Sequence, residues 1–184
     1  MNRQVLETNL RALDARTQNV GNEIQNARQR CAGYRGQAEK LEEAANRMFQ
    51  LASMEEDEEK SAHDLAMGSA YMAQAEQNYA MADEIEGQLS GMEGELLGLK
   101  EQYVMYMEEG QRNLQSLNIA VGQLMGASGS RYGRDGVKAA LGEARGQITY
   151  NQNLVNGCRQ RIGWIEGILS ESGDPYQKTY RLHR

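Results

Sequence analysis

An apolar repeat with alternating steps of four and three residues dominates the first 52 residues of the chain. It begins at Leu6 and continues for about six and a half heptads, and Thr17 is its one polar position. A seven-residue repeat sustained over this length is typical of a coiled-coil helix, because it places a narrow apolar stripe along one helix face. We therefore predict a helix over residues 3–52. The positions of the repeat are Leu6, Leu10, Leu13, Thr17, Val20, Ile24, Ala27, Cys31, Tyr34, Ala38, Leu41, Ala45, Met48 and Ala52.

Two similar repeats follow in the rest of the chain. One runs from Ile85 to Leu124 with a four-residue stutter after Gly110, and the other runs from Val137 to Leu169. A stutter relaxes the supercoil locally without ending the helix. Asn151 occupies a core position of the last repeat, where it either fixes the register of the helices at a cost in stability or faces water.

The segments between the repeats predict where the helices end. Residues 126–136 contain four glycines and predict a loop, with Asp135 capping the next helix. Residues 53–61 hold two capping-box patterns, which favour a turn over one continuous helix. We therefore predict an all-α fold, an elongated antiparallel bundle or coiled coil of three helices over residues 3–52, 61–125 and 136–171. Residues 1–173 would form this single bundle, and residues 174–184 a basic tail.

The composition agrees with long, thin helices. Val, Ile, Leu and Phe account for 31 of the 184 residues, which is too few for a thick globular core. Such a composition allows either a disordered chain or helices with a narrow buried stripe, and the heptad repeats favour the helices. The two cysteines, Cys31 and Cys158, lie in the repeats and are expected to be reduced core residues.

Charge is distributed unevenly along the chain. Residues 51–110 carry 15 acidic and 2 basic side chains, whereas residues 1–50 and 111–184 are both net basic. This pattern suits a chain that folds back twice, so that neighbouring antiparallel helices carry opposite signs. The total of −6 speaks against nucleic-acid binding.

A second stripe on the predicted middle helix consists mainly of alanine and glycine. Each glycine inside a helix costs about 1 kcal/mol relative to alanine, so four of them within twelve residues require an explanation. Three explanations are open: a close-packed seam with another helix, a break near Ser90 and Gly91, or drift at solvent positions. The middle helix would then carry two stripes, one for each neighbour. The small residues of the stripe are Ala66, Ala70, Ala73, Ala80, Gly87, Gly91, Gly94 and Gly98.

Two other segments are candidates for contact with a partner. The 126–136 loop carries Arg131, Tyr132 and Arg134 among its glycines, which indicates either an anchor for a partner or a hairpin without a role. The tail combines aromatic and basic residues and would either dock on an acidic partner or form a disordered end. Its candidate residues are Tyr176, Tyr180 and Arg181. Nine methionines between residues 48 and 125 are expected mainly to fill the thin core.

Motifs for chemistry are absent from the sequence. The two histidines, His63 and His183, do not follow a glutamate by three residues, so no di-iron or other transition-metal site is predicted. No phosphate-binding loop or nucleophile elbow occurs either. We expect a protein that is not an enzyme and has no cofactor, metal or small-molecule substrate. The sequence also has no secretory signal or apolar run long enough to span a membrane, so a cytoplasmic location is expected by default, and export without a signal stays open.

These features predict a scaffold or assembly protein that acts through helix–helix contacts with itself or with another helical chain. An alternative is a chaperone or adaptor for a client protein. In architecture alone, the chain also resembles helical export substrates and coiled-coil accessory proteins of bacterial secretion systems. It departs from the small secreted helical hairpins of that kind, because Trp164 and Gly167 are one residue too far apart for a Trp-x-Gly turn. The resemblance implies a secretion substrate or accessory subunit as a further alternative.

Overall fold

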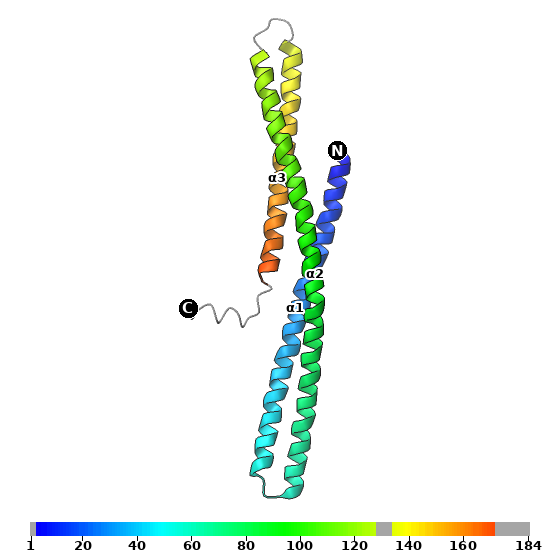
Figure 1. The fold of residues 1–184 in the computed structure, drawn as a ribbon, viewed down its shortest axis with the longest axis vertical. Helices are drawn as coiled ribbons and strands as arrows, with labels where there is room; N and C mark the ends of the chain where they lie inside the picture. The colour runs from blue at the N-terminus through cyan, green and yellow to red at the C-terminus, as the bar shows by residue number, and fades with distance from the viewer. Residues whose placement is uncertain (1–2, 128–133, 172–184) are drawn as a thin grey trace, which may run out of the picture. The chain divides into compact units, whose positions relative to one another are not determined.

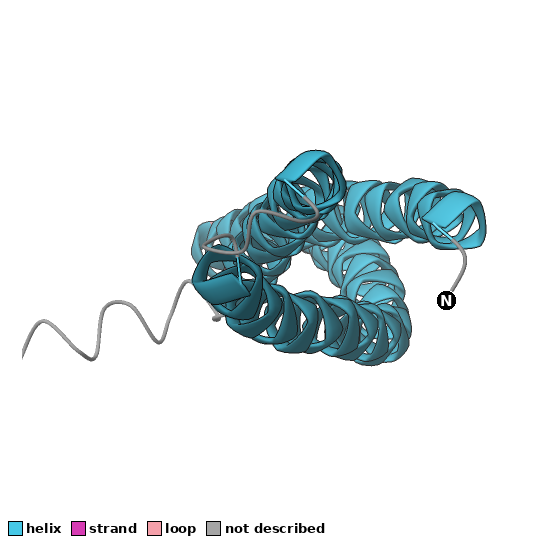
Figure 2. Cartoon of the chain, turned by 90° about the horizontal axis from the view of Figure 1, so that it is seen from above, coloured by secondary structure: helices cyan, strands magenta, loops and turns pink. Residues whose placement is uncertain are grey.

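The chain folds into three long helices. The computed structural model describes residues 3–127 and 134–171, which form α1 (Arg3–Met54), α2 (Glu58–Ala127) and α3 (Arg134–Ser170) (Figure 1). Figure 2, which colours the chain by secondary structure, shows helices and no strand among the described residues. Helix α1 packs against α2, and α3 packs against α2. The predicted all-α fold of three long helices is confirmed.

The helix ends lie within about three residues of the predicted ones. Helix α1 continues two residues beyond residue 52, and α2 begins at Glu58 rather than at residue 61. Helix α3 begins at Arg134, so Asp135 lies inside the first turn and the prediction that it precedes the helix as its cap is wrong.

A three-residue turn, residues 55–57, joins α1 to α2 as an antiparallel pair. Asp57 caps α2, because its Oδ1 atom accepts hydrogen bonds from the backbone N–H groups of Glu59 (3.0 Å) and Lys60 (3.4 Å). The Ser61 hydroxyl donates to the carbonyl oxygen of Ala52 at 2.9 Å and so ties the two helix ends together. The turn is therefore confirmed, but Asp57, and not one of the two serines of the capping-box patterns, is the capping residue.

The chain divides into two compact units, residues 1–95 and residues 96–184. In the first, α1 lies along the N-terminal part of α2, and the buried residues of α1 all belong to the predicted repeat except Gly21. Most of the buried residues facing each other toward the turn are small. They are Cys31, Ala38, Ala45 and Ala52 on α1, and Gly68, Ala75 and Ala82 on α2.

In the second unit, α3 packs against the C-terminal part of α2 with larger side chains. Tyr103 and Ile165 are fully buried, and a Cβ atom added to Gly110 would lie 2.9 Å from Val155 Cγ2. Asn151 is buried, accepts a 3.4 Å hydrogen bond from the Asn113 amide and donates one of 2.9 Å to the Gln147 carbonyl oxygen. Of the two interpretations of Asn151, the structure supports the core position. The buried residues of this unit are Leu96, Leu99, Tyr103, Gly110, Ala144, Asn151, Val155, Cys158, Ile165 and Ile168.

Ion pairs between α1 and α2 in the first unit follow the predicted charge pattern. There, three arginines of α1 pair with glutamates of α2 at 2.7–2.9 Å. In the second unit, Lys100 of α2 pairs with Glu166 of α3 at 2.7 Å, so the basic partner lies on the middle helix. The reason is that the acidic side chains of α2 are concentrated before residue 96, outside the segment that α3 covers. The three pairs of the first unit are Arg16–Glu95, Arg28–Glu93 and Arg35–Glu86.

Candidate interaction surface

The predicted stripe of alanine and glycine lies on the outer side of α2. We call it the small-residue face. Seven of its eight small residues are exposed, and Gly98 is partly exposed. A Cβ atom added at any of its four glycines would meet no atom within 4 Å, other than those of the neighbouring helix backbone. The face consists of Ala66, Ala70, Ala73, Ala80, Gly87, Gly91, Gly94 and Gly98.

Within one chain, two of the three explanations for this stripe are wrong, namely the helix break and the close-packed seam. Helix α2 is continuous from Glu58 to Ala127, so it does not break near Gly91. The small-residue face also forms no seam with a described part of its own chain, since it is exposed and its glycines face open space. The described buried residues of α2 belong to a single heptad register. The prediction that α2 carries two buried stripes, one for each neighbouring helix, is therefore wrong. Whether another chain covers the small-residue face stays a prediction.

Two other glycines, Gly68 and Gly110, allow close packing in the described part of the chain. A Cβ atom added to Gly68 would lie 2.6 Å from the Phe49 ring, and one added to Gly110 would lie 2.9 Å from Val155. The sequence contained a signal for the first of these, because Gly68, Ala75 and Ala82 are spaced by seven residues like Ala38, Ala45 and Ala52. This series of small residues was overlooked because the alanine and glycine stripe on the same helix is longer and more obvious.

The surroundings of the small-residue face make it acidic and hold α1 away from it. Glu84 lies within the stripe itself, and Glu76 and Asp83 are exposed beside it. Ion pairs on both edges of the α1–α2 contact, Arg16–Glu95 on one and Arg28–Glu93 on the other, keep α1 on the opposite side of α2. The glycines here therefore weaken the helix by about 1 kcal/mol each without any compensating contact in the described chain.

The remaining predicted contact residues lie mostly outside the described residues. Arg131 and Tyr132 belong to the segment between the two described ranges, and the tail residues Tyr176, Tyr180 and Arg181 follow the second range. Arg134 is the first residue of α3, but its side chain is not among those described. The predictions for these six residues therefore stay predictions.

The methionines are distributed differently from the expectation of core filling. Four of them are exposed: Met54 (82 %), Met105 (67 %), Met125 (60 %) and Met81 (40 %). Five others, at positions 48, 67, 72, 92 and 107, are partly exposed. They therefore flank the core rather than fill it, because small residues already occupy many of the central positions between α1 and α2.

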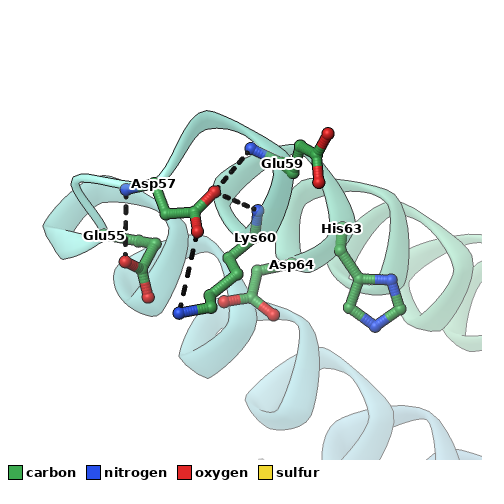
Figure 3. Close-up of a pocket in the computed structure, with 6 residues that line it drawn as sticks. All are labelled: Glu55, Asp57, Glu59, Lys60, His63 and Asp64. Carbon is green, nitrogen blue, oxygen red and sulfur yellow. Dashed lines mark hydrogen bonds and ion pairs between the residues drawn. The ribbon is translucent and has the colours of Figure 1, made fainter.

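A shallow hollow lies at the α1–α2 turn and is lined mainly by acidic side chains (Figure 3). Asp57 there forms a 3.7 Å ion pair with Lys60 in addition to capping α2. His63 lies on the far side of the group from Asp57 (Figure 3). Among the described residues, no group of three or more histidine, cysteine or carboxylate side chains is arranged to hold a metal ion. The lining residues are Glu55, Asp57, Glu59, Lys60, His63 and Asp64.

Both cysteines are free and buried, as predicted for core residues. The Cys31 thiol lies 3.6 Å from the carbonyl oxygen of Ala82, to which it donates a weak hydrogen bond. Burial raises the pKa of the Cys31 thiol, and the nearby Arg35 guanidinium offsets this only in part. A raised pKa keeps the thiol protonated near neutral pH, so Cys31 lacks the thiolate character of a nucleophile.

No protein-family model, curated protein or solved structure matches the chain. Within the described residues, no helix combines the length and the apolarity that crossing a membrane requires.

Proposed function

We propose that the protein is a non-enzymatic scaffold or assembly protein that acts through helix–helix contacts. The small-residue face of α2 would be covered by a helix of another chain, either a second copy or a different helical protein. The observation that carries the proposal is the exposure of Gly87, Gly91 and Gly94, which weaken α2 and at which an added Cβ atom would meet no described atom within 4 Å beyond the local helix backbone. A face without side chains lets a partner backbone approach closely, so contact with a partner would compensate for the lost helix stability.

The charge of α2 indicates what kind of helix fits best. Residues 58–95 carry nine acidic side chains and one basic side chain. Opposite charges on the partner would steer the encounter and disfavour wrong partners, whereas another acidic helix would be repelled. A helix with basic flanks and small residues at its centre is therefore the preferred partner for this face.

A second candidate function, an adaptor for a client protein, is favoured by the exposed methionines. Met54, Met81, Met105 and Met125 offer flexible apolar side chains that adapt to different partners. An adaptor of this kind would bind through methionine side chains rather than through the smooth backbone of the small-residue face. Replacing the four methionines by glutamine would then weaken binding, and filling the small-residue face would not.

The experiment that tests the first proposal fills the face and measures partner recovery. The double variant Gly91→Leu/Gly94→Leu places two side chains into the open space and raises helix propensity at both positions. Covalent cross-linking in the native host, followed by recovery of the protein and mass spectrometry, would identify the partner of the wild type. We expect the double variant to recover at least tenfold less of it, which corresponds to about 1.4 kcal/mol of binding free energy.

A matched control is available on α1. Gly33 and Gly36 have the same spacing as Gly91 and Gly94, and a Cβ atom at either of them also meets nothing within 4 Å. The double variant Gly33→Leu/Gly36→Leu therefore makes the same chemical change on a different helix. Recovery of the partner should be unaffected in this control. Equal recovery from both double variants would contradict the proposal for the small-residue face.

A further inference from the structure

The second unit ends in a helical hairpin whose apolar residues are incompletely covered. We call residues 111–126 of α2 together with residues 136–150 of α3 the distal hairpin. No residue of segments 111–126 and 136–143 is buried, although the heptad register continues through both segments. In the rest of the unit, positions of the same register such as Leu99, Tyr103 and Ile165 are buried. The partly exposed apolar positions of the distal hairpin are Leu114, Leu117, Val121, Leu124, Val137, Leu141 and Ile148.

Two helices alone leave this apolar register half open to water. Each helix covers only the side of the register that faces it, so leucine and valine side chains stay accessible along both edges of the pair. Met125 adds to this surface, since it lies next to the register on α2 and is 60 % exposed. Contiguous apolar surface of this kind marks a site of interaction with another protein.

The charge of the distal hairpin indicates which protein covers it. The distal hairpin carries four charged side chains, Arg112, Lys138, Glu143 and Arg145, and residues 113–127 of α2 carry none, whereas residues 58–95 of the same helix contain ten. A surface with so few charges neither attracts a strongly charged partner nor strongly repels an identical surface. The surface that matches it in charge, length and register is the same surface of a second copy.

We propose that two copies of the chain associate through their distal hairpins and form a four-helix bundle around a two-fold axis. The proposal rests on the helix–helix mode of action proposed above, but it names the partner and uses a different surface. In a two-fold interface the same patch serves both copies, and four helices in a bundle cover the apolar positions that two helices leave open. The partly exposed Ala120 of α2 and Ala140 of α3 flank the register on the edge where the second hairpin can approach.

The size of the surface sets the expected strength of the dimer. Sixteen residues of helix are about 24 Å long, and two helices side by side are about 20 Å wide. The hairpin therefore offers roughly 500 Å² per copy, or about 1,000 Å² in total, which is at the lower limit for a stable interface. We expect a reversible dimer with a dissociation constant on the order of 1–100 μM.

Sedimentation equilibrium of the full chain over a range of concentrations tests the proposal. The wild type should change from the mass of one chain to that of two as its concentration passes through the micromolar range. The double variant Ala120→Lys/Ala140→Lys should weaken the dimer at least 100-fold, because like charges then face each other across the two-fold axis. Its helix content, measured by circular dichroism, should stay unchanged, since lysine is a good helix former. The wild-type dimer should also persist at high salt, because its interface has few charges.

A matched control separates this proposal from the proposed function. The double variant Ala73→Lys/Ala80→Lys makes the same changes on the small-residue face and should leave the dimer intact. Loss of the dimer in this control, but not in Ala120→Lys/Ala140→Lys, would overturn the inference and place self-association on the small-residue face instead. A wild type that stays monomeric up to about 1 mM, well above the micromolar range expected from its area, would also overturn the inference. The proposed function would still be tested by its own cross-linking experiment.

Discussion

The two units of the chain form helix pairs in different ways. Between α1 and the first part of α2, many of the buried positions are alanine, glycine or cysteine, and three ion pairs link the two helices. Between the second part of α2 and α3, the buried positions include tyrosine, leucine, isoleucine and valine. Small residues let two helix backbones lie close together, whereas large ones hold the helices apart and fill the space between them. One chain with few large apolar residues can therefore still form a buried core in two helix pairs.

This difference implies that the units fail in opposite ways when they are mutated. A contact made by small side chains has no room for added volume, so enlarging a buried alanine should separate the helices. A contact made by large side chains is weakened when volume is removed and a cavity remains. Substitutions in both units therefore test this contrast.

The largest effect is expected from removing volume in the second unit. Ile165 is fully buried, and Ile165→Ala should lower the free energy of unfolding by about 2–5 kcal/mol. Urea unfolding followed by circular dichroism measures this change. Ile119→Ala is the control, since Ile119 is 59 % exposed and its truncation should cost much less. Equal losses in the two variants would show that burial in the second unit does not determine its stability.

A somewhat smaller effect is expected from adding volume in the first unit. Ala45 is fully buried in the contact between α1 and α2, and Ala45→Leu should lower the free energy of unfolding by about 1–3 kcal/mol. Ala73→Leu makes the same change on the exposed side of α2 and should have little effect. If Ala45→Leu stabilised the protein in urea unfolding, the close approach of the two helices in the first unit would be refuted.

The fold was largely predictable from the sequence because heptad periodicity fixes which face of each helix is buried. The buried positions of α1 lie in the predicted repeat except for Gly21, and Asn151 is buried where its repeat places it. The capping of α2 was not predictable in detail, because Ser53, Asp57 and Ser61 are all suitable capping residues and only the geometry of the turn selects Asp57.

The candidate surface was predictable only in part. The sequence identified the alanine and glycine stripe of α2, but periodicity alone does not tell whether such a stripe faces a partner or water. In the structure it is exposed, and the close contacts occur at Gly68 and Gly110 instead. Gly68 begins a heptad series of small residues, whereas Gly110 is a single small residue at a stutter, where the sequence does not specify which neighbour lies opposite.

A gain in stability is expected where a glycine faces open space. Gly91→Ala should raise the free energy of unfolding by about 1 kcal/mol, because alanine is the better helix former and its Cβ atom meets nothing within 4 Å. Gly110→Ala is the matched change in the second unit, and there the contact with Val155 at 2.9 Å should reduce or reverse the gain. Thermal unfolding, measured at a protein concentration too low for association, compares the stabilities of the two variants. The same gain in both variants would contradict the close packing of α3 on Gly110.

The smallest effect is expected from the ion pairs of the first unit. Arg28 and Glu93 form the least exposed of the three pairs, with side chains 19 % and 27 % exposed and a distance of 2.8 Å. A double-mutant cycle with Arg28→Ala and Glu93→Ala should give a coupling of about 1 kcal/mol or less, and the exposed pair Arg3–Glu7 should give about 0.3 kcal/mol. Salt at 1 M should remove the second coupling and reduce the first less, because burial shields a pair from screening. A coupling of Arg28 and Glu93 as large as the loss in Ala45→Leu would mean that charge, and not close packing of small residues, holds α1 on α2. A coupling of about 1 kcal/mol or less would mean that the ion pairs chiefly determine which face of α2 contacts α1. The stability of this contact would then come from its alanine and glycine residues.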